Sequence, residues 1–507
     1  MATSLAAGVV LELPLLLLSI GALALLVYES FSKQESSHVA GAFGMREVIT
    51  LSAMFFALFA LMSSADVASQ SPTVFYGALY VDQFSFLVSL IILVGSIGAV
   101  LLGMARLGQE GISAKAEYYS LLLMSVVGAL IFASAAELIT LFLGLEIMSL
   151  ALYCLCGAAL AKDGPPMKRS SESALKYFIL GSFSSAFMLY GIALLYGLSG
   201  STHISVIAQM GMGAHPHMLL VAIGFVLVGM AFKIGAVPFH FWVPDVYQGA
   251  PTPVTAFMAC VIKTAAVAAA LRLFWVGFGQ SFVFWSGAVW IVAVCTMVLG
   301  NLVALRQRSL KRMLAYSSIA HAGYMLVAFL VPSGQYGGEY GGGGAILYYL
   351  VVYAAMTMGA FGVLIAVTAE HNASPHPDDI GRFNGLGYRH PLLGILMALF
   401  MLSLAGIPPG LAGLMGKIFL FSAAIHAGFV GIAIIGVITS AISCYYYLRI
   451  IVAMYFLDAE LDEEPERAHI GIPLGIVLGV CAAAVLLLGV FPDRLYKAAG
   501  MVVSTLH

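Results

Sequence analysis

Apolar runs of about twenty residues follow one another along almost the whole chain, and they constrain its fold more than any other feature. An α-helix needs a run of this length to cross the hydrocarbon core of a bilayer. The sequence therefore predicts an all-α polytopic membrane protein with about fourteen transmembrane helices. The runs among the 507 residues lie at 7–28, 46–64, 80–104, 117–135, 138–160, 172–197, 217–249, 253–276, 283–304, 310–331, 344–369, 390–426, 430–456 and 471–491.

The composition excludes the other broad classes of protein. Apolar residues make up 62% of the chain and charged residues only 9%, whereas about a quarter of an ordinary soluble domain is charged. A net charge of −2 gives no attraction to polyanions. Transmembrane β-barrels show short alternating segments rather than long apolar runs. We therefore expect the lipid bilayer as a partner, and no nucleic acid.

The positions of the basic residues predict an orientation. If all fourteen runs cross the membrane, sixteen of the 22 lysines and arginines fall in the odd-numbered loops or at their borders. Three fall on the opposite side, and three lie inside the spans. Because basic residues accumulate on the cytoplasmic side, both termini are predicted to be outside, which is the periplasm in a bacterial inner membrane.

Two of the runs are too long for one straight helix, and both contain helix-breaking residues. The seventh run holds Pro238, and the twelfth run holds Pro408 and Pro409. Proline removes a helix hydrogen bond and clashes with the preceding turn. Broken helices at membrane depth occur where the freed backbone faces protein or water, so these two breaks are candidate parts of a half-channel.

The spacing of the two breaks predicts an internal repeat. They lie five runs apart, and paired broken helices are typical of transporters built from inverted repeats. We therefore expect two inverted five-helix repeats, each containing one broken helix. The predicted units are residues 1–116 (three N-terminal spans), 117–276 (first repeat, spans 4–8), 283–456 (second repeat, spans 9–13) and 471–507 (C-terminal span and tail).

Four charged residues lie at mid-membrane depth: Glu146, Lys233, Lys263 and Lys417. Each unpaired charge there costs about 3 kcal/mol on insertion scales. Static ion pairs would be one explanation, but three lysines face only one clear carboxylate. Intramembrane ionisable residues commonly mark proton or ion pathways. We therefore predict that this set handles protons or ions.

Three further polar residues are weaker candidates. His321 lies in the middle of the tenth run, between lysine-bearing runs, which favours a relay over a satisfied core histidine. His240 and Asp245 follow the break in the seventh run. They either line a water-filled half-channel or simply cap the second half of that helix.

The six cysteines give no sign of a metal or redox centre. All lie inside apolar runs, and none has the spacing that zinc, c-type haem or iron–sulfur sites require. We therefore predict no metal and no cofactor bound to this chain.

Several segments closely resemble one family. They are LFLGLEIMSLALYCL around Glu146, SSESALKYFILGSFSSAFMLYG at 170–191, FKIGAVPFHFWVPDVYQGAPTPVTAF at 232–257 and KRMLAYSSIAHAGYML at 311–326. They are similar to the antiporter-like subunit N of the proton-pumping NADH:quinone oxidoreductase, respiratory complex I. The FWVPDVYQGAPTPVT form distinguishes this family from its sister subunits and from the related cation/proton antiporters. The resemblance covers about residues 75–456.

The resemblance implies a function and a set of partners. It implies a membrane-arm subunit that translocates protons through Glu146, Lys233, Lys263, His321 and Lys417, coupled to electron transfer elsewhere in an oxidoreductase complex. NADH, FMN, iron–sulfur clusters and quinone are expected in partner subunits. Other antiporter-like and small membrane-arm subunits are the expected protein partners.

One departure from the family pattern concerns Lys417. The segment GIPPGLAGLMGK is one residue longer between the prolines and the lysine than the usual form. An extra helical residue would rotate Lys417 by about 100°, although a loop or a π-bulge could absorb it. Two other functions stay open: a subunit of an Mrp-type cation/proton antiporter, and a structural membrane scaffold whose charges only fix helix packing.

Overall fold

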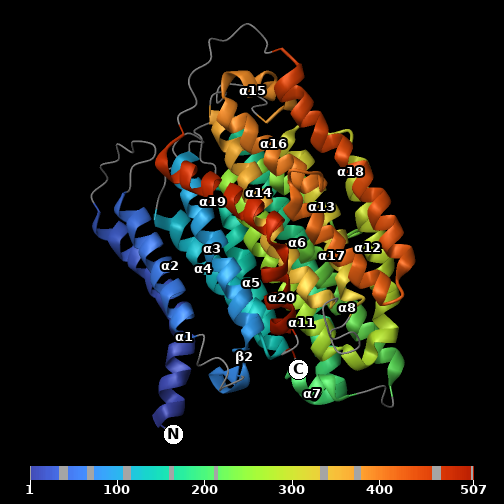
Figure 1. Ribbon diagram of the computed structural model, residues 1–507. Helices are drawn as coiled ribbons and strands as arrows, with labels where there is room; N and C mark the ends of the chain where they lie inside the picture. The colour runs from blue at the N-terminus through green and yellow to red at the C-terminus, as the bar shows by residue number, and fades with distance from the viewer. Residues whose placement is uncertain are drawn as a thin grey trace.

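The computed structural model of the protein describes residues 2–32, 44–64, 73–106, 116–158, 165–210, 215–331, 341–369, 378–458, 470–503 and 506. Its helices lie side by side in one elongated bundle, with α1 and α2 at one edge and α12 and α18 at the other (Figure 1). The N-terminal part consists of α1 (Ala2–Phe31), α2 (Met45–Ser63), the antiparallel strands β1 (Thr73–Val74) and β2 (Leu79–Tyr80) around the 3₁₀ turn η1 (Phe75–Gly77), and α3 (Gln83–Arg106).

The helices of the first predicted repeat follow, and they end in a helix with two π-helical turns, η2 and η3. They are α4 (Ala116–Ser134), α5 (Leu138–Cys156), α6 (Pro165–Ser199), α7 (Ile204–Ala208), α8 (Pro216–Ile234), α9 (Trp242–Gly249), α10 (Thr252–Phe257), η2 (Met258–Ile262), α11 (Lys263–Arg272) and η3 (Leu273–Gly277).

The second half begins after the 3₁₀ turn η4 (Gly279–Ser281), and two C-terminal helices complete the described chain. The second half contains α12 (Phe282–Ala304), α13 (Leu310–Phe329), α14 (Gly342–Ala369), η5 (Ile380–Phe383), α15 (Leu386–Arg389), α16 (Pro391–Ala405), α17 (Leu411–His426) and α18 (Val430–Phe456). The C-terminal helices are α19 (Ile472–Val490) and α20 (Pro492–Val503).

The span count agrees with the sequence. Twelve helices in the described part of the chain are long and apolar enough to cross a membrane. The remaining two predicted spans are α13 and the broken pair of α16 and α17, whose halves are each shorter than a full span. The prediction of an all-α polytopic membrane protein with about fourteen spans is confirmed.

The connections alternate between the two ends of the bundle, and the two termini lie toward the same end, as an even number of spans requires (Figure 1). The start of α1, strand β2, helix α7 and the end of α20 lie toward one end, and α15 lies at the opposite end (Figure 1). Which end faces the cytoplasm stays a prediction from the basic residues.

Close glycine crossings recur at corresponding places in the two predicted repeats. A Cβ atom at Gly128 of α4 would lie 2.4 Å from the backbone of α5, and one at Gly144 of α5 would lie 2.6 Å from that of α4. In α12 and α13, a Cβ at Gly300 or at Gly323 would lie 2.7 Å from the facing backbone. Small residues allow such close helix approach in membranes. The fourth and fifth spans therefore pack as the ninth and tenth do.

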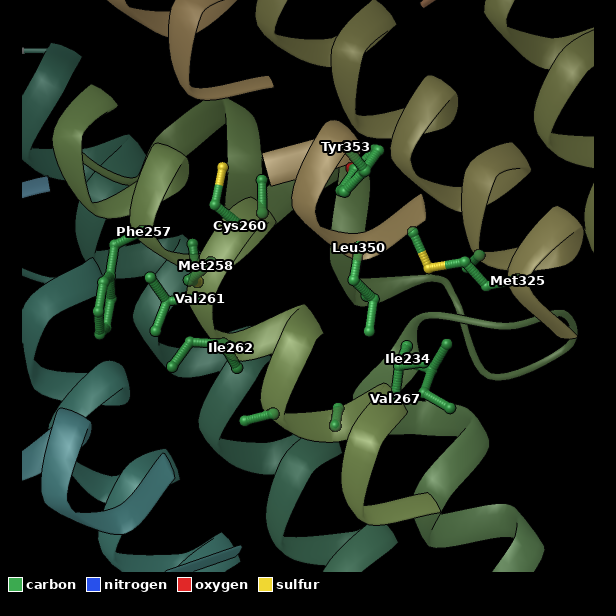
Figure 2. Close-up of a cluster of buried hydrophobic side chains, with 14 of the residues drawn as sticks. Ile234, Phe257, Met258, Cys260, Val261, Ile262, Val267, Met325, Leu350 and Tyr353 are labelled. Atoms are coloured by element: carbon green, nitrogen blue, oxygen red, sulfur yellow. The ribbon is translucent and has the colours of Figure 1, made fainter. Parts of the chain in front are cut away.

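The eighth span is the hub of the bundle. Its most apolar stretch, within Thr252–Gly277, is completely buried inside the protein. Figure 2 shows its apolar side chains gathered with Ile234 of α8, Met325 of α13 and Leu350 of α14. Lys263 belongs to this hub, so its charged group is surrounded by protein rather than by lipid.

An ion pair joins the end of this hub to the N-terminal helices. Arg272 of α11 contacts both carboxylate oxygens of Asp82 at 2.7 and 2.9 Å, and it also donates to Ser85 Oγ at 2.9 Å. The Arg272 side chain is buried. A bidentate contact therefore joins the start of α3, the third N-terminal helix, to the end of α11.

Candidate functional site

The first break follows Lys233 and has a left-handed glycine at its centre. Helix α8 ends at Ile234, and Gly235 has φ 82° and ψ 35°. The backbone N–H groups of Gly235 and Ala236 both donate to the carbonyl of Ala231, at 3.0 and 2.8 Å. This Schellman-type ending stops the helix before Pro238, and α9 begins at Trp242. The predicted break in the seventh span is confirmed.

Lys233 is buried and bound by hydroxyl groups. It is only 4% exposed, and its Nζ donates to Ser149 Oγ of α5 at 2.8 Å and to Tyr177 Oη of α6 at 3.1 Å. Glu146 lies one helical turn before Ser149 on the same helix, α5. No direct ion pair joins Glu146 to Lys233 among the described residues, and Glu146 Oε1 is buried without a hydrogen-bond partner there.

Lys263 directly follows the π-helical turn η2 in the hub. Its Nζ donates to the carbonyl of Ser318 at 2.6 Å and also contacts the Ser318 hydroxyl. It lies 5.6 Å from the centre of the Tyr353 ring, a cation–π distance. Because Ser318 and His321 are three residues apart on α13, they lie on one face of that helix. The structure therefore brings Lys263 to the neighbourhood of His321.

His321 is fully buried and both of its ring nitrogens are hydrogen-bonded. Nδ1 contacts Tyr349 Oη of α14 at 2.6 Å, and Nε2 contacts Tyr447 Oη of α18 at 3.0 Å. The Tyr447 hydroxyl also contacts Ser317 Oγ. A neutral imidazole donates from one nitrogen and accepts at the other, and hydroxyl partners permit either arrangement.

The second break precedes Lys417 and repeats the geometry of the first. Helix α16 ends at Ala405, and Gly406 has φ 82° and ψ 43°. The N–H groups of Gly406 and Ile407 both donate to the carbonyl of Leu402 at 2.9 Å. Pro408 and Pro409 follow in the same break, and α17 begins at Leu411. The predicted break in the twelfth span is confirmed.

Lys417 points into the protein and reaches back across this break. It is 4% exposed, and its Nζ donates to the carbonyls of Leu404 and Ala405 at 3.0 and 2.8 Å and to Ser440 Oγ at 2.8 Å. Those two carbonyls end α16, where the helix dipole favours a cation. The residue inserted between the prolines and Lys417 has therefore not turned the lysine away from the interior.

The two weaker candidates after the first break have different surroundings. His240 is 4% exposed, and its Nδ1 has no hydrogen-bond partner among the described residues. Asp245 lies in the first turn of α9 and forms ion pairs with Lys176 at 2.9 Å and Arg312 at 2.7 Å. Asp245 thus joins α9 to α6 and α13, a tertiary contact that neither predicted role included.

Comparison with known proteins identifies the family. Residues 135–443, more than half of the chain, match the family model described as NADH:quinone oxidoreductase/Mrp antiporter, TM. NADH-quinone oxidoreductase subunit N of Trichlorobacter lovleyi is 44% identical over 434 residues, which cover 85% of each chain. The subunit N of Methylobacterium nodulans is 40% identical over 499 residues, which cover 97% of each chain. The chain belongs to the subunit N family of NADH-quinone oxidoreductases.

Solved structures agree with this family. A chain of respiratory complex I from Thermus thermophilus with bound aureothin has a TM-score of 0.75 and 34% sequence identity, covering 97% of this chain and 99% of that one. A chain of the Mrp complex from Dietzia sp. DQ12-45-1b has a TM-score of 0.80 at 21% identity, covering 98% of this chain and 97% of that one. That second likeness shows a shared fold alone.

Sequence reasoning missed the hydroxyl groups that surround the charged residues of this subunit N family member. Six are tyrosines or serines that contact the lysines or His321 directly: Ser149, Tyr177, Ser318, Tyr349, Ser440 and Tyr447. Tyrosine and serine are common in membrane helices, and no spacing in the sequence sets these six apart. Only packing shows which hydroxyls face a buried charge.

Proposed function

We propose that the chain is a membrane-arm subunit of NADH:quinone oxidoreductase that translocates protons through Glu146, Lys233, Lys263, His321 and Lys417. Electron transfer in other subunits would drive this transport. One observation carries the proposal: all three mid-membrane lysines are only 4% exposed, and their contacts are to hydroxyl and carbonyl oxygens.

The hydroxyl groups among these partners suit a group that changes its protonation state. A protonated lysine has three donors, and a neutral one keeps two donors and gains an acceptor. Hydroxyl partners can donate or accept, so they accommodate both forms. Buried lysines that only fixed helix packing would be expected to face carboxylates, because an uncompensated buried charge is costly.

The order of the groups defines a route. Glu146 interacts with protonated Lys233 in the resting state. Electron transfer elsewhere weakens that interaction, and the proton leaves Lys233 for Lys263 and His321, then for Lys417 and the outer side. Moving one charge against about 180 mV takes about 4 kcal/mol, which is comparable to the roughly 3–5 kcal/mol that leaving a buried charge uncompensated costs.

Substitution of Lys233 by arginine tests this route. Arginine keeps the positive charge and the donors but does not release its proton. We expect the complex with Lys233→Arg to assemble. The proton uptake assigned to this subunit should fall about tenfold or more. The measurement is proton uptake by inverted vesicles per NADH oxidised, normalised to assembled complex.

Lys176→Arg is the matched control for that experiment. Lys176 forms static ion pairs with Asp245 and Glu172, and arginine serves such pairs well. Its uptake should stay near that of the wild type. Near wild-type uptake in both arginine variants would instead support the scaffold function.

An Mrp-type antiporter subunit would share the buried charges but would need no redox partner. The 40–44% identity to subunit N proteins favours the oxidoreductase. We place no cofactor in this chain and expect NADH, FMN, iron–sulfur clusters and quinone in partner subunits. Purification of the chain from native membranes should therefore recover flavin and iron–sulfur subunits, and recovery without them would favour the antiporter.

We also propose that the subunit lies in the bacterial inner membrane with both termini in the periplasm, on the basis of the basic residues. Single cysteines near Lys168, Arg308 and Gly385 should resist an impermeant thiol reagent in intact cells. Cysteines near Ser199 and Gly341 should react. Labelling of the opposite set would reverse the orientation.

A further inference from the structure

Asn301 of α12 is a completely buried polar residue that connects three helices. Its Nδ2 donates to the carbonyl of Met297 at 2.7 Å and to Tyr324 Oη of α13 at 3.0 Å. Its Oδ1 accepts from Tyr446 Oη of α18 at 2.9 Å. The proton route described above does not use this residue.

The surroundings of Asn301 fix the direction of each hydrogen bond. The carbonyl of Met297 can only accept, so the amide nitrogen must face it. A flipped amide would place two acceptor oxygens against one another. Because Oδ1 carries no hydrogen, Tyr446 must donate to it, and Tyr324 must accept from Nδ2.

Both tyrosines are connected to His321, Tyr324 directly and Tyr446 through Tyr447. The ring of Tyr324 is close to both His321 and Lys417: its centre is 5.7 Å from that of the His321 ring and 5.4 Å from Lys417 Nζ. On the other side, Tyr446 packs against Tyr447 with ring centres 4.4 Å apart, and the Tyr447 hydroxyl contacts His321 Nε2.

We propose that Asn301 is a positioning residue for proton transfer between His321 and Lys417. It holds Tyr324 and Tyr446 in one hydrogen-bonded arrangement, and through them it keeps the imidazole and the amine aligned. The amide neither gains nor loses a proton at neutral pH, so Asn301 stays off the route itself. This inference rests on the proposed proton-transfer function.

A purely structural role would give Asn301 a different sensitivity to substitution. Leucine has the same number and branching of side-chain heavy atoms as asparagine, with bulkier methyl groups at the two ends, so it would fill the site but make no hydrogen bond. Serine leaves a cavity, but its hydroxyl can accept from Tyr446 and donate to a carbonyl. If Asn301 acts only by packing, Asn301→Leu should retain more proton uptake than Asn301→Ser. If Asn301 positions the two tyrosines, Asn301→Ser should retain more than Asn301→Leu.

The experiment compares these variants in the whole complex. Proton uptake per NADH oxidised is measured in inverted vesicles, normalised to assembled complex, and scaled to the uptake that Lys417→Arg removes. We expect Asn301→Leu to lose most of that uptake, about fivefold or more, and Asn301→Ser to keep about half. Thermal stability of the complex is measured in parallel, and the variants should not rank in stability as they rank in proton uptake.

Tyr324→Phe and Tyr446→Phe keep the rings and guard against misfolding of the Asn301 variants. If Asn301 acts through the two hydroxyls, the double phenylalanine variant should match Asn301→Leu, and adding Asn301→Leu to it should change little. Additive losses, or better uptake in Asn301→Leu than in Asn301→Ser, would overturn the positioning role.

The Lys417→Arg variant distinguishes a failure of the proposed function from a failure of the positioning role alone. Wild-type uptake in Lys417→Arg would contradict the proposed function, and the positioning role would fail with it. Lost uptake in Lys417→Arg together with wild-type uptake in Asn301→Leu would contradict the positioning role alone.

Discussion

The two helix breaks, at Gly235 and at Gly406, have the same pattern of backbone hydrogen bonds. Their lysines, however, lie on opposite sides of the break along the sequence. Lys233 lies two residues before its left-handed glycine, on the half-helix that ends there. Lys417 lies eleven residues after its glycine, on the half-helix that follows. The position that corresponds to Lys233 in the second break is Leu404, and Lys417 binds the carbonyl of that residue.

The difference lies in the oxygens that each lysine contacts. Lys233 has two side-chain hydroxyls, from Ser149 and Tyr177, which can donate as well as accept. Lys417 has two backbone carbonyls, which can only accept, together with Ser440 Oγ. Three acceptors match the three donors of an ammonium group. The first break therefore accommodates either form of its lysine, and the second suits the charged form.

The largest effect should come from removing either amine. Lys233→Met and Lys417→Met should each lower the proton uptake of this subunit about tenfold or more, because methionine cannot carry a proton. If the two halves act in series, the double variant should be no worse than either single variant. Vesicle uptake assays on assembled complex test this, and a further loss in the double variant would mean that the two lysines serve separate routes.

Alanine at the two glycines should separate a backbone effect from a lysine effect. A left-handed conformation costs a non-glycine residue about 1–2 kcal/mol, so both variants should lower thermal stability. A Cβ at Gly235 would lie 2.9 Å from Val243 Cγ2, whereas one at Gly406 would lie 3.4 Å from Lys417 Cδ. Gly235→Ala should therefore have the lower unfolding temperature, and Gly406→Ala the lower uptake per complex. The reverse order in both assays would contradict this difference between the breaks.

The stability of the two methionine variants should also differ. Lys417→Met leaves the carbonyls of Leu404 and Ala405 without their lysine donor, and an unsatisfied buried polar group costs about 1–3 kcal/mol. Lys233→Met leaves hydroxyls, which can rotate toward other partners. We expect Lys417→Met to be less stable than Lys233→Met by about 1–2 kcal/mol, as thermal unfolding of the purified complex would measure. Equal midpoints would mean that the carbonyls find other donors.

The smallest effects should come from the serine partners. Ser149→Ala removes one of the two hydroxyls at Lys233, while Ser440→Ala leaves Lys417 with both carbonyls. One hydrogen bond is worth about 1 kcal/mol, or about fivefold in an equilibrium. Ser149→Ala should thus lower uptake by up to about fivefold, and Ser440→Ala by less. A larger loss in Ser440→Ala would reverse the comparison.

Much of the fold could be predicted from the sequence because the bilayer restricts the choices. Apolar runs of spanning length become helices, and Gly and Pro within overlong runs become breaks. For the same reason the buried charges were visible, since Lys263 and Lys417 stand out against apolar neighbours. The boundaries of the two repeats stay a prediction, although the matching glycine crossings and breaks support them.

Two features of the structure could not be predicted in the same way. Asp245 was expected to line a half-channel or cap a helix, and the structure shows in addition that it pairs with Lys176 and Arg312, which lie far from it in the sequence. Asn301 gave no signal, because one amide in an apolar run is compatible with many surroundings. Both depend on contacts between helices that are distant in sequence.

The sequence by itself determined that this chain is a bundle of membrane helices with two breaks and a set of buried ionisable groups. Hydrophobic length and the cost of charge in lipid act on each segment separately, so they can be read without knowing its neighbours. The tertiary structure alone decided which oxygens face each lysine and which hydroxyls meet His321. Hydrogen bonds depend on distances and directions between helices, and no local pattern in the sequence encodes those.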